Sequence, residues 1–178
     1  MIKNVIFDLG NVLLSFEPKE YVKSKVLEEK IEEIYESIFK SKEWPMLDRG
    51  TITEEEAKVN IINRKVENKD FINSVFENWY DILTPIESSV EVLKKLKERG
   101  YKVFYLSNFH LAAFEYVTKK HDFFALFDGG VVSYKEKLLK PEKEIYEKIL
   151  FEYNLKPNET VFIDDMEVNV KAAMDNGM

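Results

Sequence analysis

Polar side chains that can do chemistry follow the apolar runs of this sequence. Asp8 comes directly after one apolar run, Ser107-Asn108 ends a second, and Asp164-Asp165 ends a third. Lys140 stands in front of an amphipathic segment. In an open parallel sheet, ligands bind beyond the carboxyl ends of the strands. If these runs are strands of one such sheet, three carboxylates, a hydroxyl, an amide and an amine meet in one crevice.

This set of groups is typical of phosphoryl transfer. Three carboxylates in a partly buried site repel one another and take up protons unless a cation lies between them. Magnesium favours one or two carboxylates together with phosphate oxygens. A lysine, a serine and a helix N-terminus all suit a phosphate group. The pattern therefore favours a carboxylate nucleophile that acts on a small phosphorylated molecule with Mg²⁺ as cofactor.

Each of these residues, taken alone, also has a plain structural explanation. Asp8 before Leu9-Gly10 is typical of a turn that ends a strand, and Asp164-Asp165 is typical of residues that cap a helix. Lys140 fits an ordinary surface position. The active-site interpretation depends on their combination at successive strand ends.

The elements that must position these groups alternate between strands and helices. Apolar runs predict strands over residues 2–9, 101–106, near 131–132 and over 160–163. Helical patterns lie between them, and Lys140-Pro141 is expected to begin one helix because proline suits the first helical position. This alternation predicts an α/β fold with a Rossmann-like three-layer core and a mostly parallel sheet.

A long segment interrupts that alternation. Between residues 18 and 83 apolar residues recur at helical spacing, and the stretch is too long for an ordinary connection. We therefore predict an inserted α-helical cap over 18–83 and a core formed by 1–17 and 84–178. Trp44, Asp48 and Arg49 form the most chemically mixed loop of the cap. They either set substrate specificity, or Trp44 packs in the cap core while Asp48-Arg49 forms a solvated turn.

Composition excludes several other classes of protein. The 178 residues contain no cysteine, which rules out disulfides, thiolate metal sites and a cysteine nucleophile. The net charge of −7 argues against nucleic acid and anionic membranes as partners. No apolar run approaches the ~20 residues of a membrane span, and the N-terminus lacks the pattern of a signal peptide. We expect a cytoplasmic protein, and the oligomeric state stays open.

The chain resembles the haloacid dehalogenase-like (HAD) superfamily of hydrolases, in the subgroup with an α-helical cap. The four motifs of that superfamily occur in order, as 5–12 around Asp8, then 105–108, then Lys140-Pro141, then 162–165 with Asn169. The resemblance covers essentially the whole chain. It implies that Asp8 is the nucleophile, forms an aspartyl-phosphate and also binds Mg²⁺.

The resemblance also implies roles for the other motif residues. Ser107 and Asn108 bind the phosphate, and Lys140 neutralises both nucleophile and phosphate. The backbone carbonyl of Gly10 binds the metal. The remaining groups at the metal are the Asp165 carboxylate, with Asp164 and Asn169 in support.

One position departs from the family pattern. Gly10 stands where phosphatases of this family usually carry a second aspartate, which protonates the leaving group and later activates water. General acid–base help is worth about 10²–10⁴-fold. His110 is a candidate substitute acid, although a lone histidine at a helix start is more often a capping or surface residue.

The sequence around Gly10 still favours a substrate class. The run 8–12, Asp-Leu-Gly-Asn-Val, resembles sugar-phosphate phosphatases, including a glucose-1-phosphate phosphatase. An anomeric sugar oxygen is a better leaving group than an ordinary alcohol, and it therefore needs less protonation. The same glycine leaves a second interpretation open, that of a catalytically weak binding or regulatory module.

Two further functions are disfavoured by the motifs. Dehalogenases of this superfamily work without metal. Because the Asp164-Asp165 pair is typical of a metal site, it argues against a dehalogenase. Receiver domains carry their acidic pair on the first strand, whereas here it follows the last one. The chain stops at Gly177-Met178, where such a fold is expected to add another strand, so we expect either a truncated C-terminus or a sheet that lacks its terminal strand.

Overall fold

A parallel four-stranded sheet lies at the centre of the computed structural model, which describes residues 1–178. The strands are β1 (Asn4–Phe7), β2 (Lys102–Ser107), β3 (Gly129–Val132) and β4 (Thr160–Ile163), in the spatial order β3-β2-β1-β4. The four strands predicted from the sequence are present, with ends that shift by up to about two residues. The chain adds β2 and β3 on one side of β1 and then β4 on the other side, so the strand order reverses at β1.

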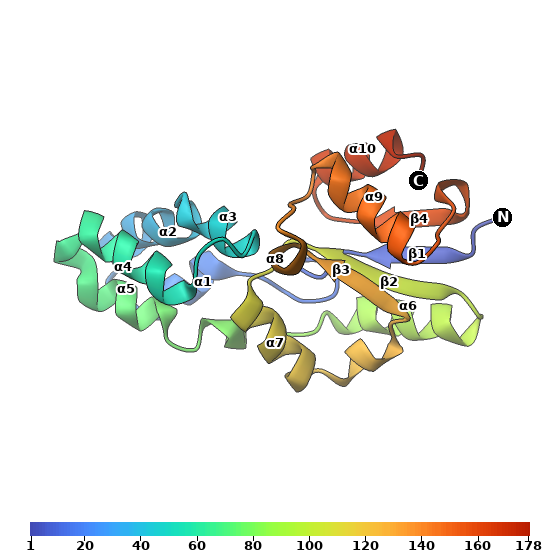
Figure 1. Ribbon diagram of the computed structural model, residues 1–178. Coiled ribbons are helices and arrows are strands. Elements are labelled where there is room, and N and C mark those ends of the chain that lie inside the picture. Colours follow the sequence, from blue (N-terminus) through green and yellow to red (C-terminus); the bar gives the residue numbers. More distant parts are fainter.

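Helices cover both faces of the sheet (Figure 1). Side chains of β1 alternate, so that Val5 and Phe7 join one core and Ile6 joins the other. Helices α6 (Glu87–Glu98) and α7 (Leu111–Lys120) pack on the first face. Helices α9 (Lys143–Glu152) and α10 (Glu167–Asp175) pack on the second. The predicted three-layer α/β fold is therefore confirmed.

An all-helical insertion follows β1 and stands beside the sheet (Figure 1). Its helices are α1 (Pro18–Lys23), α2 (Ile31–Phe39), α3 (Glu43–Asp48), α4 (Glu54–Arg64) and α5 (Lys69–Phe76). Short 3₁₀ turns occur in this region at Glu28–Lys30, Val66–Asn68 and Trp79–Ile82. Two more occur in the core, at Asp122–Leu126 and Pro157–Glu159. The insertion has its own core, which includes Ile34, Ile38 and Ile72. A helical insertion is thus confirmed, while residues 18–83 as the limits of a separate cap stay a prediction.

The predicted helix start at Lys140-Pro141 is wrong. Helix α9 begins at Lys143, and the short helix α8 (Ser133–Glu136) precedes the turn that holds Lys140. The backbone N–H of Lys140 donates to Asn108 Oδ1 at 2.8 Å, and its carbonyl accepts from Asn108 Nδ2 at 3.1 Å. Because both backbone groups already have a side-chain partner, this residue is fixed in the turn before α9, against the residue that follows β2. No helix in the protein combines the length and the apolar composition that crossing a membrane requires.

Candidate active site

The ends of three strands bring the motif residues together. Phe7 in β1 pairs with Tyr105 in β2 and with Ile163 in β4, so the residues that follow these positions leave the sheet at the same edge. The next residues in β1 and β4 are Asp8 and Asp164. This edge lies where the strand order reverses, which is the place where open α/β sheets bind ligands.

Lys140 joins two of these carboxylates. Its Nζ lies 2.8 Å from Asp8 Oδ1 and 2.5 Å from Asp164 Oδ2, and its side chain is 2% exposed. Asp164 Oδ1 in turn accepts from the backbone N–H of Met166 at 2.8 Å and from Asn169 Nδ2 at 2.9 Å. The ammonium group is therefore held at a fixed place between the end of β1 and the start of α10. The Asn108 amide, predicted to bind phosphate, holds the Lys140 backbone in this structure.

The surroundings of Asp8 make its charged form costly. Burial raises the pKa of the Asp8 carboxyl, the Lys140 ammonium opposes that rise, and the negative charge of Asp164 adds to it. Interaction with the Ser107 hydroxyl also favours the charged form. The net effect is a raised pKa, because desolvation is the largest contribution. A carboxylate that is buried and poorly solvated is more reactive toward an electrophile than one in water.

This raised pKa predicts a pH-dependent gain in stability when Asp8 is neutralised. In the folded protein Asp8 binds a proton more readily than in the unfolded chain, so its contribution to the free energy of unfolding falls as pH rises above the ordinary value of 3.8. Asp8→Asn removes that effect. In EDTA, the Tm of the variant should exceed that of the wild type at pH 8, and the difference should shrink as pH falls to 4. A difference that does not change with pH would contradict the burial of a charged Asp8.

The carboxylates fit a divalent cation. Oxygen atoms of Asp8, Asp164 and Asp165 lie within 4.8 Å of one another. Asp8 Oδ1 is buried and has no hydrogen bond, since the nearby Lys140 ammonium meets the distance of an ion pair without the angle of a hydrogen bond. A buried carboxylate oxygen with free lone pairs is a group that a hard cation satisfies. All-oxygen donors of this kind suit Mg²⁺ rather than a soft metal.

A small cavity of about 130 Å³ opens beside Gly10. A Cβ added at Gly10 would meet no atom within 4 Å, so this position borders open space. Aromatic side chains from the insertion and its flanks form much of the wall, chiefly Phe16, Trp44 and Trp79. Trp44 stacks with Phe16 at 6.1 Å between ring centroids and also lines the cavity, so packing and a role at the site are compatible for this residue.

The predicted loop around Trp44, Asp48 and Arg49 is in fact helix α3 and the residue that follows it, and its C-terminal end bonds to the core. The Arg49 guanidinium makes a two-pronged ion pair with Glu142, beside the start of α9, and donates to the Lys137 carbonyl at 3.0 Å. The Ser133 hydroxyl donates to the backbone carbonyl of Asp48 at 2.5 Å. A solvated turn, one of the two interpretations of this loop, is therefore wrong, because these contacts fix it against the core.

Asn11 was not assigned to the site from the sequence, and His110 was considered there only as a candidate substitute acid. The Asn11 amide nitrogen lies 3.5 Å from Asp165 Oδ2, and the residue has a left-handed backbone with φ of 54°. His110 is 4% exposed and makes no side-chain cap bond at α7, so its interpretation as a capping or surface residue is wrong. Asn11 lies within the turn after Asp8, and that position was the available signal. For His110, burial depends on packing against the insertion, which no local pattern reveals.

Comparisons with known proteins identify the family. The sequence matches the haloacid dehalogenase-like hydrolase family over residues 2–177, and the chain belongs to that family. The protein is therefore a hydrolase of the class predicted from its motifs. Among curated proteins, the sesquiterpene phosphatase astK of Aspergillus oryzae is 29% identical over 176 residues, which covers 99% of this chain and 87% of that protein.

Solved structures agree with this assignment. A HAD family enzyme from Bacteroides thetaiotaomicron, solved with magnesium and inorganic phosphate, is 29% identical with a TM-score of 0.77, and the match covers 100% of this chain and 92% of that one. An L-2-haloacid dehalogenase from Xanthobacter autotrophicus has a TM-score of 0.69 at 17% identity, with 99% and 75% of the two chains covered. The second likeness extends to the fold alone. The roles assigned to individual residues stay predictions.

Proposed function

We propose that this protein is a magnesium-dependent phosphatase that hydrolyses small phosphorylated metabolites through an aspartyl-phosphate on Asp8. The observation that carries the proposal is the buried Asp8 carboxylate, which lies between the Lys140 ammonium and the Ser107 hydroxyl at the switch point of the sheet. The phosphatase activity named for the Aspergillus oryzae relative supports it. Asp8, Asp165 and the Gly10 carbonyl would hold Mg²⁺, with Asp164 and Asn169 in support, and the bound ion would supply charge neutralisation for the phosphoryl group.

The residues of the chain supply the remaining parts of the reaction. An oxygen of Asp8 attacks phosphorus, while the ester oxygen leaves with the bonding electrons and takes up a proton. Lys140 balances negative charge on the nucleophile and on the phosphoryl oxygens, and Ser107 donates to one of those oxygens. Asn108 holds Lys140 through its backbone, so that the ammonium is in place before the substrate arrives.

Two substrate classes are supported by different observations. The motif at residues 8–12 favours sugar phosphates, as described above. The cavity beside Gly10 favours an apolar leaving group, because its polar side chains are only Asp48, Asn108 and His110, and both ends of the Asn108 amide are already bonded. Several sugar hydroxyls buried there would lack partners, at about 1–3 kcal/mol each. The sesquiterpene phosphatase relative agrees with the apolar class. Trp44, Asp48 and Arg49 are the residues that we expect to set this choice.

The release of inorganic phosphate tests the proposal. With Mg²⁺ present, we expect the protein to hydrolyse farnesyl monophosphate or glucose 1-phosphate, and EDTA should abolish the activity. The ratio of kcat/KM between the two substrates decides the class, and the cavity predicts a preference for farnesyl monophosphate. If the protein becomes phosphorylated but never releases phosphate, the weak binding or regulatory module that Gly10 left open is favoured instead.

A further inference from the structure

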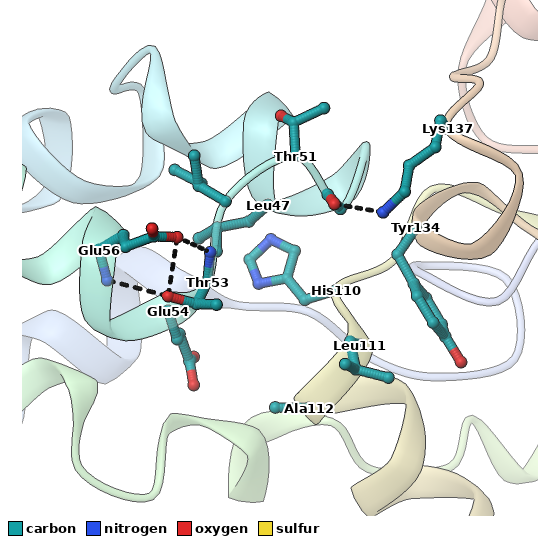
Figure 2. Close-up of a pocket in the computed structure, with 12 residues that line it drawn as sticks. Leu47, Thr51, Thr53, Glu54, Glu56, His110, Leu111, Ala112, Tyr134 and Lys137 are labelled. Carbon is teal, nitrogen blue, oxygen red and sulfur yellow. Dashed lines mark hydrogen bonds between the residues drawn. The ribbon is translucent and has the colours of Figure 1, made fainter.

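His110 occupies an unusual place between the insertion and the core. Its ring projects from the start of α7 into the space enclosed by residues 50–56 and by α7 itself (Figure 2). It packs against Trp44 in a tilted arrangement, at 4.3 Å between ring centroids, and against Trp79 edge to face, at 5.4 Å. The ring borders two cavities, a larger one of about 300 Å³ and the small one beside Gly10.

The polar atoms of this ring are free although the ring is buried. Neither Nδ1 nor Nε2 has a hydrogen-bond partner, and the side chain is 5% exposed. Nε2 lies 3.1 Å from Asp48 Oδ1, which meets the distance of an ion pair but not the angle of a hydrogen bond. Buried polar atoms without partners are rare, and they call for an explanation such as a catalytic role.

The other charged groups around the ring have partners of their own. Glu54 accepts from Trp79 Nε1 at 2.5 Å and from the Tyr80 hydroxyl, and Glu56 closes the capping box with Thr53. Lys137 donates to the Gly50 carbonyl, and Tyr134 lines the far side of the larger cavity. Among the charged groups that face the ring, only the Asp48 carboxylate has no other hydrogen bond or ion pair, and it also lines the cavity beside Gly10.

We infer that His110, paired with Asp48 of the insertion, is the general acid and base that position 10 does not provide. This inference rests on the proposed function. When Asp8 attacks phosphorus and the ester P–O bond breaks, the His110 imidazolium gives the proton on Nδ1, the ring nitrogen that does not face Asp48, to the departing oxygen, and the product is an alcohol. When water then attacks the aspartyl-phosphate, its proton returns to Nδ1, the bond between phosphorus and Asp8 breaks, and inorganic phosphate leaves.

The two members of this pair come from different parts of the fold. Asp48 comes from the insertion and His110 comes from the core, so the pair forms only when the two are docked. The contacts of Arg49 with Glu142 and of the Asp48 carbonyl with Ser133 hold them together. The proton donor is thus assembled by docking of the insertion on the core.

Two esters with different leaving groups test the inference. The 4-nitrophenolate anion leaves without protonation, whereas the alkoxide of 2-phenylethyl phosphate requires a proton. For His110→Gln we expect kcat/KM to fall by about 10²-fold with the alkyl ester and by less than about threefold with the nitrophenyl ester. With the nitrophenyl ester, phosphorylated enzyme should accumulate, so that kcat and KM fall together. The pH dependence of kcat/KM for the alkyl ester should also lose one limb in this variant.

Further variants guard against a merely structural effect. Asp48→Asn, at a less buried position, should show the same selectivity for the alkyl ester with a smaller loss. Gly10→Asp introduces a carboxylate into open space and should restore at least about tenfold of the lost activity when combined with His110→Gln. His121→Gln serves as the matched control, since that ring contacts the Leu83 carbonyl and lies outside the site, and both esters should be unaffected.

The outcomes separate this inference from the proposed function. Equal losses with both esters in His110→Gln and in Asp48→Asn, or no loss at all, would overturn the role of the pair. Failure of the wild-type protein to hydrolyse 4-nitrophenyl phosphate in Mg²⁺ would overturn the proposed function and the inference together. Hydrolysis by the wild type with an unselective loss in the variants overturns the inference alone.

Discussion

Asp8→Asn should reduce phosphate release by about 10⁴-fold or more while the protein stays folded. The amide nearly matches the carboxylate in shape, so the packing at the end of β1 is retained. It cannot act as the nucleophile, because an amide oxygen carries no charge to form a bond to phosphorus. The measurement is kcat/KM with Mg²⁺ and the best substrate of the screen, together with the Tm.

A matched control makes this result specific. Asp175→Asn changes the same side chain at the exposed C-terminal residue of α10, at the opposite end of that helix from Asp164 and Asp165, and should leave kcat/KM unchanged. If Asp8→Asn retained more than about a tenth of the wild-type activity, Asp8 would not be the nucleophile. The Tm separates loss of chemistry from loss of folding, since the variant is expected to be at least as stable as the wild type above pH 7.

Lys140→Met should remove activity and also destabilise the protein. The ammonium is the shared partner of Asp8 and Asp164, and the side chains of those two residues are 10% and 0% exposed. Removal of one member of a buried ionic cluster leaves charge without compensation, at a cost of about 3–5 kcal/mol. Chemical denaturation at pH 7.5 in EDTA measures this loss as a change in the free energy of unfolding.

The pH dependence of that loss checks its cause. Without Lys140, only the Ser107 hydroxyl opposes the rise in the pKa of Asp8 that burial and Asp164 produce, so a proton relieves the repulsion as pH falls. The destabilisation should therefore be smaller at pH 5 than at pH 7.5. Lys143→Met provides the control, because that ammonium pairs with Glu147 at the surface and should change the free energy of unfolding by less than about 1 kcal/mol. A loss that is equal at both pH values would indicate lost packing instead.

Much of the fold could be predicted from local patterns. Runs such as Val5-Ile6-Phe7 are apolar on both faces, which is what a strand between two helical layers requires, and turn residues mark their ends. The capping box of Thr53 and Glu56 begins α4 as its sequence predicts. The start of α9 was missed because the backbone of Lys140 bonds to Asn108, a contact between residues 32 positions apart. Long-range contacts of this kind override a local preference of proline.

The candidate site, too, could be predicted where it depends on local patterns and could not where it depends on long-range contacts. Asp8 and Asp164 could be placed together because each follows a strand end, and a parallel sheet brings such ends to one edge. Lys140 was placed there by its family motif, in front of an expected helix. The environment of His110 could not be predicted. Its burial depends on Trp44 and Trp79, which come from separate parts of the chain, and on the docking of the insertion against the core. The apolar wall beside Gly10 has the same origin, which is why the motif alone pointed to sugars.

The central claim is that Asp8 carries the phosphoryl group, and rapid acid quenching tests it most directly. The wild-type protein is mixed with Mg²⁺ and the best substrate, quenched during the first turnover, digested and analysed by mass spectrometry. We predict that the peptide containing Asp8 gains the mass of one phosphoryl group, that hydroxylamine removes it, and that Asp8→Asn lacks it. Phosphate on another residue, or rapid release of phosphate with no labelled peptide at any time, would contradict the claim.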